Sequence, residues 1–383
     1  MTEIAIVGAG EMGRATLRVL TRHLPDARFR VLDRSPDNLH QAREVATEAA
    51  CELIDLDREA PDLAGANLVA NFAGPFYHGS TTLARAALHS GVPYVDICDD
   101  VEGIGPILDL DGEARAAGVP LITGAGNSPG SSNLMAKRLL ELYPAIDGIR
   151  IVWVVGDTDP GGLAPLRHML HMAVAPCPVW RDGEFIDEAG FVPSTARVHD
   201  LPDIGRVAAF NTAHSEPITL ARAFPGLRHI SVQGALIPAW ANEVFSALGR
   251  IGFGYDDLEI EVDERPVEPV EVLWKMLWAR HHARRRDGDR RGVTVVQVQG
   301  LIRDTLHAAM TIVDPCSMVR TTALGAGAAV LEILRQTPAA GAWGTEVLPA
   351  QPTLDILADL AKPDGAMPGG LRLQSPAVAQ TSR

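Results

Sequence analysis

Ten residues near the N-terminus decide the fold: Ile4-Ala5-Ile6-Val7-Gly8-Ala9-Gly10-Glu11-Met12-Gly13. The apolar run before Gly8 predicts a buried strand, and the residues after Gly10 favour a helix. The three glycines allow a tight turn, close approach of a ligand to the backbone, and close packing of the helix on the strand. We interpret Gly8 to Gly13 as a dinucleotide-binding loop whose helix N-terminus faces a pyrophosphate.

An acidic residue follows this loop at a spacing typical of dinucleotide-binding units. Asp33 lies twenty positions beyond Gly13, after a second predicted strand. Its carboxylate can accept hydrogen bonds from ribose hydroxyls and repel a 2′-phosphate, which favours NAD(H). Arg34 and Ser35 can instead hold a 2′-phosphate if Asp33 turns away, so NADP(H) is possible, and FAD also stays open.

The first 128 residues alternate short β-branched runs with helical patterns, as expected for a parallel sheet covered by crossover helices. The sequence therefore predicts an α/β protein with an N-terminal Rossmann domain, a doubly wound parallel sheet, at residues 1–128. The strands that we expect in it are Ile4–Val7, Phe29–Leu32, Leu53–Leu56, Leu68–Phe72, Tyr94–Ile97 and Leu121–Thr123.

The remainder of the chain has longer strands and hairpins. We predict an α+β domain of mixed or antiparallel sheet at residues 129–314, serving substrate binding and dimerisation. Within residues 315–348, the small-residue helix Thr321–Arg335 is expected to return to the Rossmann domain. Residues 349–383 are interpreted as a C-terminal tail, and the Arg-rich segment Arg280–Arg291 as a solvated hairpin connection.

Charge and composition exclude several classes of function. The formal net charge of −14 argues against nucleic acid as a partner, because that binding depends on Lys and Arg. The four cysteines form no CxxC pair, so we expect no disulfide framework and no metal. We find neither a bilayer-length apolar run nor a secretory signal before the first strand, and we expect a cytoplasmic protein without a membrane partner. Base rates favour a homodimer.

Three further motifs carry a family resemblance. Asn71-Phe72-Ala73-Gly74-Pro75-Phe76, Tyr94-Val95-Asp96 and Gly124-Ala125-Gly126-Asn127-Ser128-Pro129-Gly130, in this order, resemble the saccharopine dehydrogenase (saccharopine reductase-like) family. His214-Ser215-Glu216-Pro217-Ile218-Thr219-Leu220 is similar to its mid-domain strand. In such a protein we expect Asn71 to Pro75 to lie beside the cofactor.

The resemblance also implies an activity. It implies an NAD(P)-dependent oxidoreductase acting at a C–N centre, by imine reduction, reductive amination or oxidation of a secondary amine in an amino-acid-like small molecule. A related branch is similar to trans-acting enoyl reductases, which reduce C=C bonds. A sensor that binds the dinucleotide without turnover is the remaining alternative.

The loops after the fourth and fifth strands supply the candidate catalytic residues, because a Rossmann substrate lies at the carboxyl ends of the strands. Tyr77 and His78 can meet the substrate there, and His78 can donate a proton or simply cap a helix. Asp96 is the leading substrate-side candidate, as an ammonium ligand or an acid, together with Asp99. Asp99 and Asp100 can alternatively cap the next segment.

Residues farther along the chain complete the candidate set. Asn127, after the sixth strand, can contact substrate or cofactor. Arg167 and His171 are candidates for binding a substrate carboxylate, although His168 and Arg197 are equally compatible with the pattern. His168 and His171 share a helical face but lack the further ligand pattern of a zinc site.

Overall fold

A seven-stranded sheet forms the N-terminal half of the computed structural model, which describes residues 2–156, 163–255, 259–285, 293–362 and 370–378. All its strands pair in parallel, in the order β17-β6-β5-β4-β1-β2-β3. This is the predicted doubly wound sheet with one added strand. The order in which the chain adds its strands reverses between β4 and β1. The strands are β1 (Glu3–Val7), β2 (Arg28–Asp33), β3 (Ala50–Leu53), β4 (Leu68–Asn71), β5 (Tyr94–Asp96), β6 (Pro120–Thr123) and β17 (Gly341–Gly344).

Helices cover both faces of this sheet because its strands alternate their apolar side chains between two cores. Ile4 and Ile6 pack with α1 (Glu11–His23), while Ala5 and Val7 pack with α3 (Thr82–Ser90) and α5 (Asp111–Ala117). Helix α2 (Pro36–Val45) covers β2 and β3, and its N-cap Ser35 accepts a hydrogen bond from the Asn38 amide.

Two elements of this domain differ from the sequence prediction. Strand β3 lies three residues before the predicted Leu53–Leu56, because it is an exposed edge strand without an apolar pattern. Helix α4 (Val101–Leu108) was not predicted, since Gly103, Gly105 and Pro106 are poor helix formers. It forms there because Ile104 and Ile107 are buried.

The second sheet is mixed, as predicted, in the order β10-β11-β12-β7-β15-β16-β18, with β8 and β9 joined to β12. Only the β12–β7 pair is parallel in its described ladders. Its strands are β7 (Gly148–Gly156), β8 (Cys177–Arg181), β9 (Glu184–Glu188), β10 (Arg197–Leu201), β11 (Gly205–Asn211), β12 (His229–Ile237), β15 (Thr294–Ile302), β16 (Thr305–Asp314) and β18 (Arg372–Val378).

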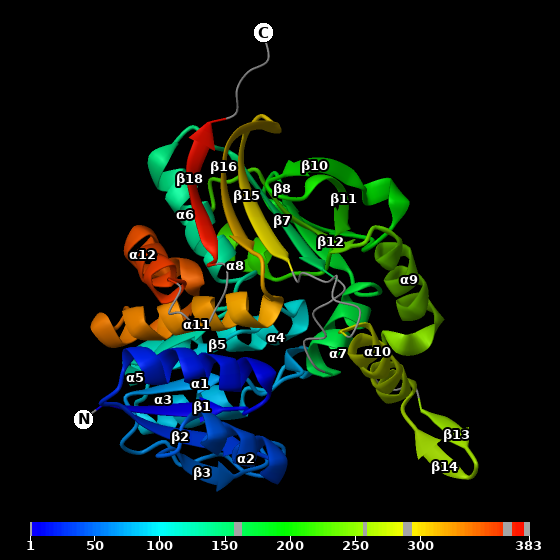
Figure 1. Ribbon diagram of the computed structural model, residues 1–383. Helices are drawn as coiled ribbons and strands as arrows, with labels where there is room; N and C mark the ends of the chain where they lie inside the picture. Colours follow the sequence, from blue (N-terminus) through cyan, green and yellow to red (C-terminus); the bar gives the residue numbers. More distant parts are fainter. Residues whose placement is uncertain (1, 157–162, 256–258, 286–292, 363–369, 379–383) are drawn as a thin grey trace.

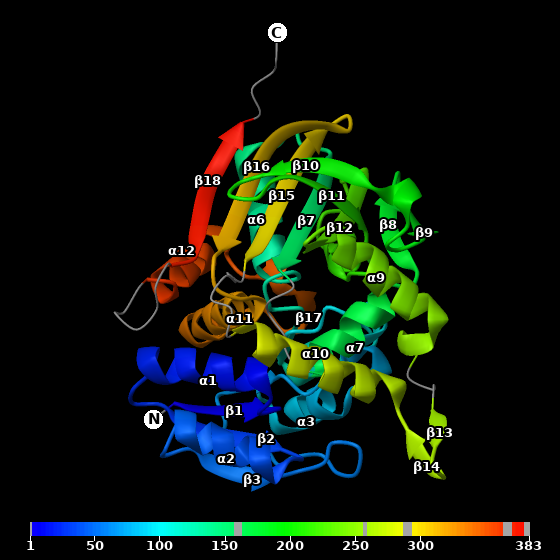
Figure 2. The ribbon, with the colours of Figure 1, turned by 45° about the vertical axis from the view of Figure 1, so that its right-hand side comes forward.

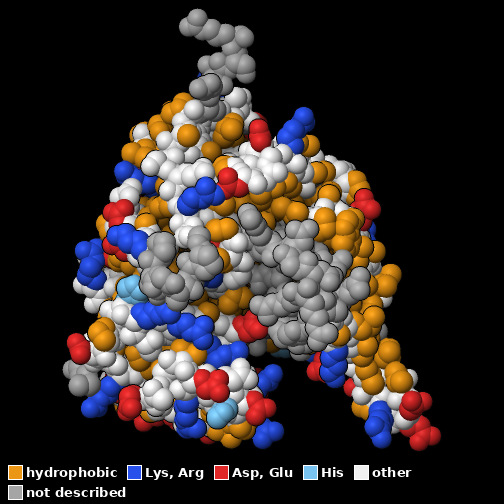
Figure 3. Space-filling model, viewed as in Figure 1, with side chains coloured by type: hydrophobic (Ala, Val, Ile, Leu, Met, Phe, Trp, Pro, Cys, Tyr) orange, Lys and Arg blue, Asp and Glu red, His pale blue; other side chains and the backbone are white. Residues whose placement is uncertain are grey.

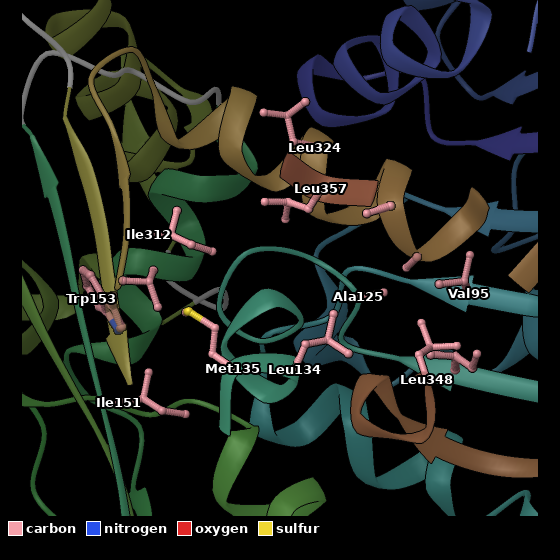
Figure 4. Packing of buried hydrophobic residues seen from close by; sticks show 14 of the residues in the cluster. Val95, Ala125, Leu134, Met135, Ile151, Trp153, Ile312, Leu324, Leu348 and Leu357 are labelled. Carbon is pink, nitrogen blue, oxygen red and sulfur yellow. The ribbon is translucent and has the colours of Figure 1, made fainter. Parts of the chain in front are cut away.

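Three helices fill the space between the two sheets (Figure 1): α6 (Ser131–Leu142), α11 (Met318–Arg335) and α12 (Ala350–Leu360). Helix α11 packs on α1, and α6 packs on β15. Figure 4 shows the resulting core, in which Met135 lies between Trp153 of the second sheet and Ala125 of the first domain. One continuous apolar cluster therefore joins the two sheets.

The interpretation of residues 349–383 as a tail is wrong for its described part. Leu354, Leu357 and Leu360 of α12 are buried against α11, and β18 pairs with β16 as an edge strand. Composition hid these elements because Ala, Gly and Pro dominate the segment. The other domain limits remain our proposal, with β17 and α11 placed against the Rossmann domain.

Two other expectations also need correction. Glu216 begins helix α8 (Glu216–Ala223), so the stretch from His214 to Leu220 is not a strand. Arg280 to Arg285 belong to helix α10 (Pro269–Arg285) rather than to a hairpin connection, and residues 286–292 lie outside the described residues. The dense Arg and His content masked the helical pattern in the sequence, although helices tolerate Arg well.

An arm stands away from the body. It consists of the hairpin β13 (Ile260–Val262) and β14 (Arg265–Val267), which extends beyond α10 (Figure 2). Hydrophobic side chains run along it and charged ones cluster at its tip (Figure 3). Among the described residues, no helix combines the length and the apolar character needed to span a bilayer.

The glycine loop makes a stability prediction. A methyl group at residue 13 would overlap the Gly8 carbonyl oxygen, whereas one at residue 10 meets no atom within 4 Å. We expect Gly13→Ala to lower the free energy of unfolding by about 1–3 kcal/mol and Gly10→Ala to leave it unchanged. Thermal unfolding of both variants checks this, and equal unfolding midpoints would contradict it.

Dinucleotide affinity should fall in both, because the Gly10 methyl occupies the expected path of the pyrophosphate.

Candidate active site

The glycine loop lies at the carboxyl end of β1, beside the point where the strand order reverses. Gly8 has a φ of +89°, and its amide donates to the Leu32 carbonyl at 2.8 Å. Gly10 is the N-cap of α1, so the first amides of that helix face the loop. This arrangement provides the anion-binding helix N-terminus that the sequence predicts.

Asp33 is turned toward this loop rather than out of it. Its Oδ2 accepts a hydrogen bond from the Ala9 amide at 2.6 Å, and its Oδ1 accepts one from the Ser35 amide at 2.7 Å. The Asn38 side-chain amide donates to both oxygens at 3.2 and 3.3 Å. The carboxylate is therefore satisfied by the protein itself, while the adjacent Arg34 side chain is 72% exposed.

The loop after β4 is held by a chain of buried polar groups. The Asn71 side chain accepts from the Ala73 amide at 3.0 Å and donates to the Tyr94 hydroxyl at 2.9 Å. That hydroxyl donates to Asp96 Oδ2 at 2.8 Å. The chain fixes the loop in which Phe72, Gly74 and Pro75 line the main cavity, as expected for residues beside a cofactor.

Asp96 does not face that cavity. It is 1% exposed, and its Oδ1 accepts from the Cys98 amide, the Gly124 amide and the Thr123 hydroxyl at 2.8–2.9 Å. Burial raises the pKa of Asp96, and these hydrogen bonds oppose the rise. In this placement the lone pairs of Asp96 join the loops after β5 and β6, so a substrate would have to displace these hydrogen bonds, and the role of Asp96 in substrate binding stays a prediction.

The main cavity has a volume of about 150 Å³ and lies between the two sheets. Met12 of the glycine loop and the loops after β4, β5 and β6 form one wall. The second domain forms the other, through β7, β15 and α7 (Leu163–Met172). The lining residues on which the argument depends are Met12, Phe76, Asp99, Asp100, Asn127, Trp153, His168, Met169, Met172, His214 and Thr294.

A histidine between two carboxylates forms the centre of the cavity wall. His168 Nδ1 lies 2.6 Å from Asp100 Oδ1, a hydrogen bond. Its Nε2 lies 3.1 Å from Asp99 Oδ2, but without the angle of a hydrogen bond. Asp100 occupies the N-cap position of α4, yet its side chain makes no capping hydrogen bond, because it is directed at His168.

The charges of Asp99, Asp100 and His168 shift one another's pKa values. Burial by itself lowers the pKa of His168, but the two carboxylates outweigh it and raise this pKa to about 9. Enclosure by the cavity walls raises the pKa of Asp99 to about 6, although 32% of its side chain still faces open space. For Asp100, burial is opposed by His168, which lowers its pKa. Asp99 is thus the member that can exchange a proton near neutral pH.

A second imidazole–carboxylate pair lies next to this cluster. The His214 and His168 rings meet edge to face, with centroids 5.7 Å apart, and His214 Nδ1 lies 3.2 Å from Glu216 Oε2. Glu216 is fully buried and accepts hydrogen bonds from the hydroxyls of Ser128 and Ser132. Burial raises the pKa of Glu216, but His214 and Ser128 outweigh this and lower it.

Besides His168 Nε2, two buried polar atoms of the lining have no hydrogen-bond partner within the described residues. They are Asn127 Oδ1, in a residue 6% exposed, and Thr294 Oγ1, in a residue 1% exposed. A buried acceptor without a donor is destabilising by about 1–3 kcal/mol, so a water or ligand group that donates a hydrogen bond to these atoms would be stabilised here. Asn127 was predicted from the sequence, and Thr294 was not.

The other predicted site residues lie outside the lining. Tyr77 stacks on His171 with centroids 4.7 Å apart, and His78 packs edge to face on Tyr77. His171 Nε2 contacts Glu102 at 3.1 Å, and Arg167 is paired with Glu268. Both Arg167 and His171 thus have acidic partners, which a substrate carboxylate would have to displace, and their role in substrate binding stays a prediction.

Asp99, Asp100 and His168 are also the one described group whose ligand-type atoms could hold a metal ion, all within 4.8 Å of one another. Both ring nitrogens of His168 lie within 3.1 Å of a carboxylate oxygen, and the 2.6 Å contact with Asp100 is a hydrogen bond. A protonated imidazole explains this geometry. The expectation that the protein uses no metal stays a prediction.

Comparisons with known proteins agree with the sequence motifs. Residues 4–122 match the family described as "Saccharopine dehydrogenase NADP binding domain". The apo saccharopine dehydrogenase (L-Glu forming) of Saccharomyces cerevisiae has a similar structure, with a TM-score of 0.67 and 15% identity, covering 99% of this chain and 100% of that one. The chain is therefore similar to this family over residues 4–122 and to that dehydrogenase in its overall fold. The resemblance found in the sequence is thereby confirmed.

More distant solved structures share less of the architecture. GenD2 from gentamicin A biosynthesis, in complex with NAD, has a TM-score of 0.41 and 12% identity over 99% of this chain and 97% of that one. The WlbA dehydrogenase from Thermus thermophilus, in complex with NAD and UDP-GlcNAcA, has a TM-score of 0.41 and 14% identity over 95% and 96%. The family match over residues 4–122 indicates a nicotinamide-dinucleotide-binding domain, and the similarity to the Saccharomyces cerevisiae dehydrogenase shows the overall fold.

The His168 cluster makes a prediction about pH. Because the pKa of His168 is raised to about 9 in the folded state, its stabilisation is complete below the unfolded pKa near 6.5 and is lost as pH rises through 9. We expect the unfolding midpoint of the natural protein to fall between pH 6.5 and 9 and that of His168→Gln to fall less. His40→Gln, at an exposed site on α2, is the control. Parallel pH profiles for the natural protein and His168→Gln would contradict this assignment.

Proposed function

We propose that this protein is an NAD(P)-dependent oxidoreductase that transfers hydride at a C–N centre. The observation that carries the proposal is that the Asp99–His168–Asp100 cluster lines the same cavity as Met12 of the dinucleotide-binding loop. A proton-exchanging group and the expected position of the hydride carrier therefore face the same space.

The chain's own residues can handle the proton of such a reaction. When an amine is oxidised to an imine, hydride leaves the carbon with its electron pair for the dinucleotide, and the nitrogen loses a proton. Asp99 faces the cavity and can accept that proton, while His168 stabilises its charge. In the reverse direction the same carboxyl returns the proton to nitrogen. Phe76, Trp153 and the two methionines of α7 would exclude water from the site.

For the dinucleotide, we propose NADP(H), although the sequence by itself favoured NAD(H). Asp33 has its hydrogen bonds within the protein and is 8% exposed, so ribose hydroxyls would have to displace them. Arg34 is exposed beside it, 3.9 Å from Asp57 in a weak surface pair, and Ser35 begins α2. These groups suit a 2′-phosphate, and the domain family that matches is described as NADP binding.

A second candidate function is reduction of a C=C bond in an apolar substrate. It is favoured by the second-domain wall, where Trp153, Met169 and Met172 contribute apolar surface. Consumption of the reduced dinucleotide with an enoyl thioester as the hydride acceptor would distinguish this function from the first, because the thioester contains no reacting nitrogen.

The dinucleotide proposal is tested at Arg34. We expect Arg34→Ala to raise the dissociation constant for NADPH about 10-fold or more, because a charge-assisted hydrogen bond to the 2′-phosphate is lost. Affinity for NADH should stay within about twofold. Arg43→Ala, also exposed on α2, is the matched control. Fluorescence titration measures the affinities of the natural protein and both variants for NADPH and NADH, and tighter binding of NADH than NADPH by the natural protein would contradict the proposal.

The catalytic proposal is tested at Asp99. With a substrate pair that the natural protein turns over, Asp99→Asn should lower kcat about 100-fold or more while the affinity for dinucleotide is kept. The pH profile of kcat should lose its limb near pH 6. Asp109→Asn, exposed at the end of α4, is the matched control. A protein that binds NADPH but consumes none with amines, carbonyls or enoyl thioesters would be a sensor, and the proposal would fail.

A further inference from the structure

The charges that line the cavity do not suit a carboxylate. Asp99 and Asp100 provide two acidic groups, and the positive charge of His168 lies between them. Among the lining residues that the structure describes, none is Lys or Arg. Arg167, on the same helix as His168, is paired with Glu268 instead. A carboxylate near the reacting carbon would therefore meet the acidic oxygen of Asp99, while the positive charge of His168 is already shared by two carboxylates in the described lining.

The unpartnered acceptor in the cavity calls for a donor. Asn127 Oδ1 is buried without a hydrogen bond, in a side chain more than nine-tenths buried, and Asn127 lines the same cavity as Asp99. An acceptor of this kind is satisfied by an N–H group of the ligand. Ammonium and iminium nitrogens offer that N–H together with a positive charge, which Asp99 favours.

The remaining wall selects for an apolar body. Trp153, Met169 and Met172 of the second domain and Phe76 of the first surround the polar cluster. Methionine side chains adapt to irregular apolar groups, and the Trp153 ring is held by its Nε1, which donates to the Thr212 hydroxyl at 3.3 Å. A cavity of about 150 Å³ accommodates a group roughly as large as benzene.

Resting on the proposed function, we propose that the substrate is a cationic amine, or the corresponding iminium, that has an apolar body and no carboxylate beside the reacting carbon. Aldehyde and protonated amine condense to the iminium with loss of water. Hydride from the reduced dinucleotide then forms the C–H bond, the C=N π electrons become the nitrogen lone pair, and Asp99 protonates that lone pair to give the ammonium product. In oxidation the ammonium first passes one N–H proton to Asp99, and hydride then leaves the carbon of the neutral amine to give the iminium. This class differs from the amino-acid-like substrate that the sequence suggested.

The test uses four mixtures that differ only in carboxylates. Phenylacetaldehyde and phenylpyruvate differ by one carboxylate on the carbonyl carbon, and methylamine and glycine differ by one on the amine partner. Each carbonyl is combined with each amine, and NADPH consumption by the full-length protein is followed. We expect kcat/KM for phenylacetaldehyde with methylamine to exceed that for phenylpyruvate with glycine by about 100-fold or more. Equal rates, or faster turnover of the carboxylated pair, would overturn the proposal.

A binding measurement keeps the proposal testable apart from turnover. The complex with NADP⁺ is titrated calorimetrically with N-methylphenethylamine and with N-methylphenylalanine, which differ only by the carboxylate. Tighter binding of the first supports the proposal, and equal or tighter binding of the second overturns it. If the amine binds but no mixture consumes NADPH, the oxidoreductase proposal has failed while the ligand class stands.

A charge substitution supplies the internal control. Met169→Lys places a cation on the half-buried face of α7. We expect it to reduce the preference for phenylacetaldehyde with methylamine over phenylpyruvate with glycine about 10-fold or more. Met276→Lys, at a site 64% exposed on α10, should leave the preference unchanged. A preference that Met169→Lys leaves intact would mean that lining charge does not select the substrate, and the proposal would be overturned.

Discussion

The close approach of two backbones at Gly126 and Gly325 is the constraint on which the arrangement of the two domains depends. A Cβ atom at residue 325 would overlap the Gly126 carbonyl, so only glycine lets α11 lie this close to the loop after β6. Gly130, with a φ of +117°, packs against Gly126 from within that loop. Through this contact α11 closes one side of the cavity with Met318 and Thr322.

The three carboxylates at the end of β5 and in the loop after it have different roles, although they lie within a few residues of one another. Asp96 has its lone pairs saturated by the loops after β5 and β6 and so acts as a structural anchor. Asp99 and Asp100, only a few residues later, point across the domain boundary to His168. The distinction is one of solvation and partners, since a carboxylate with several donors has little capacity left for a substrate.

The two domains thus contribute unlike chemistry to one cavity. The Rossmann domain brings the dinucleotide loop, the carboxylates and the unpartnered Asn127, whereas the second domain brings His168, and both domains contribute apolar side chains to the wall. Because the continuous core between the sheets holds α6, α11 and α12, these groups are positioned by packing rather than by a flexible loop. Such preorganisation lowers the entropic cost of bringing substrate and dinucleotide together.

The sequence by itself determined the local features: the glycine loop, the parallel strands that follow it, and the presence of Asp99 and Asn127 after the fifth and sixth strands. These follow from periodicity and from turn chemistry, which act over a few residues. The pairing of His168 with Asp99 and Asp100 joins residues nearly seventy positions apart, and no local pattern separates His168 from Arg167 or His171. Burial, hydrogen bonding and the direction of each side chain arise only when the sheets pack together, so tertiary structure alone decided which carboxylate anchors and which one faces the cavity.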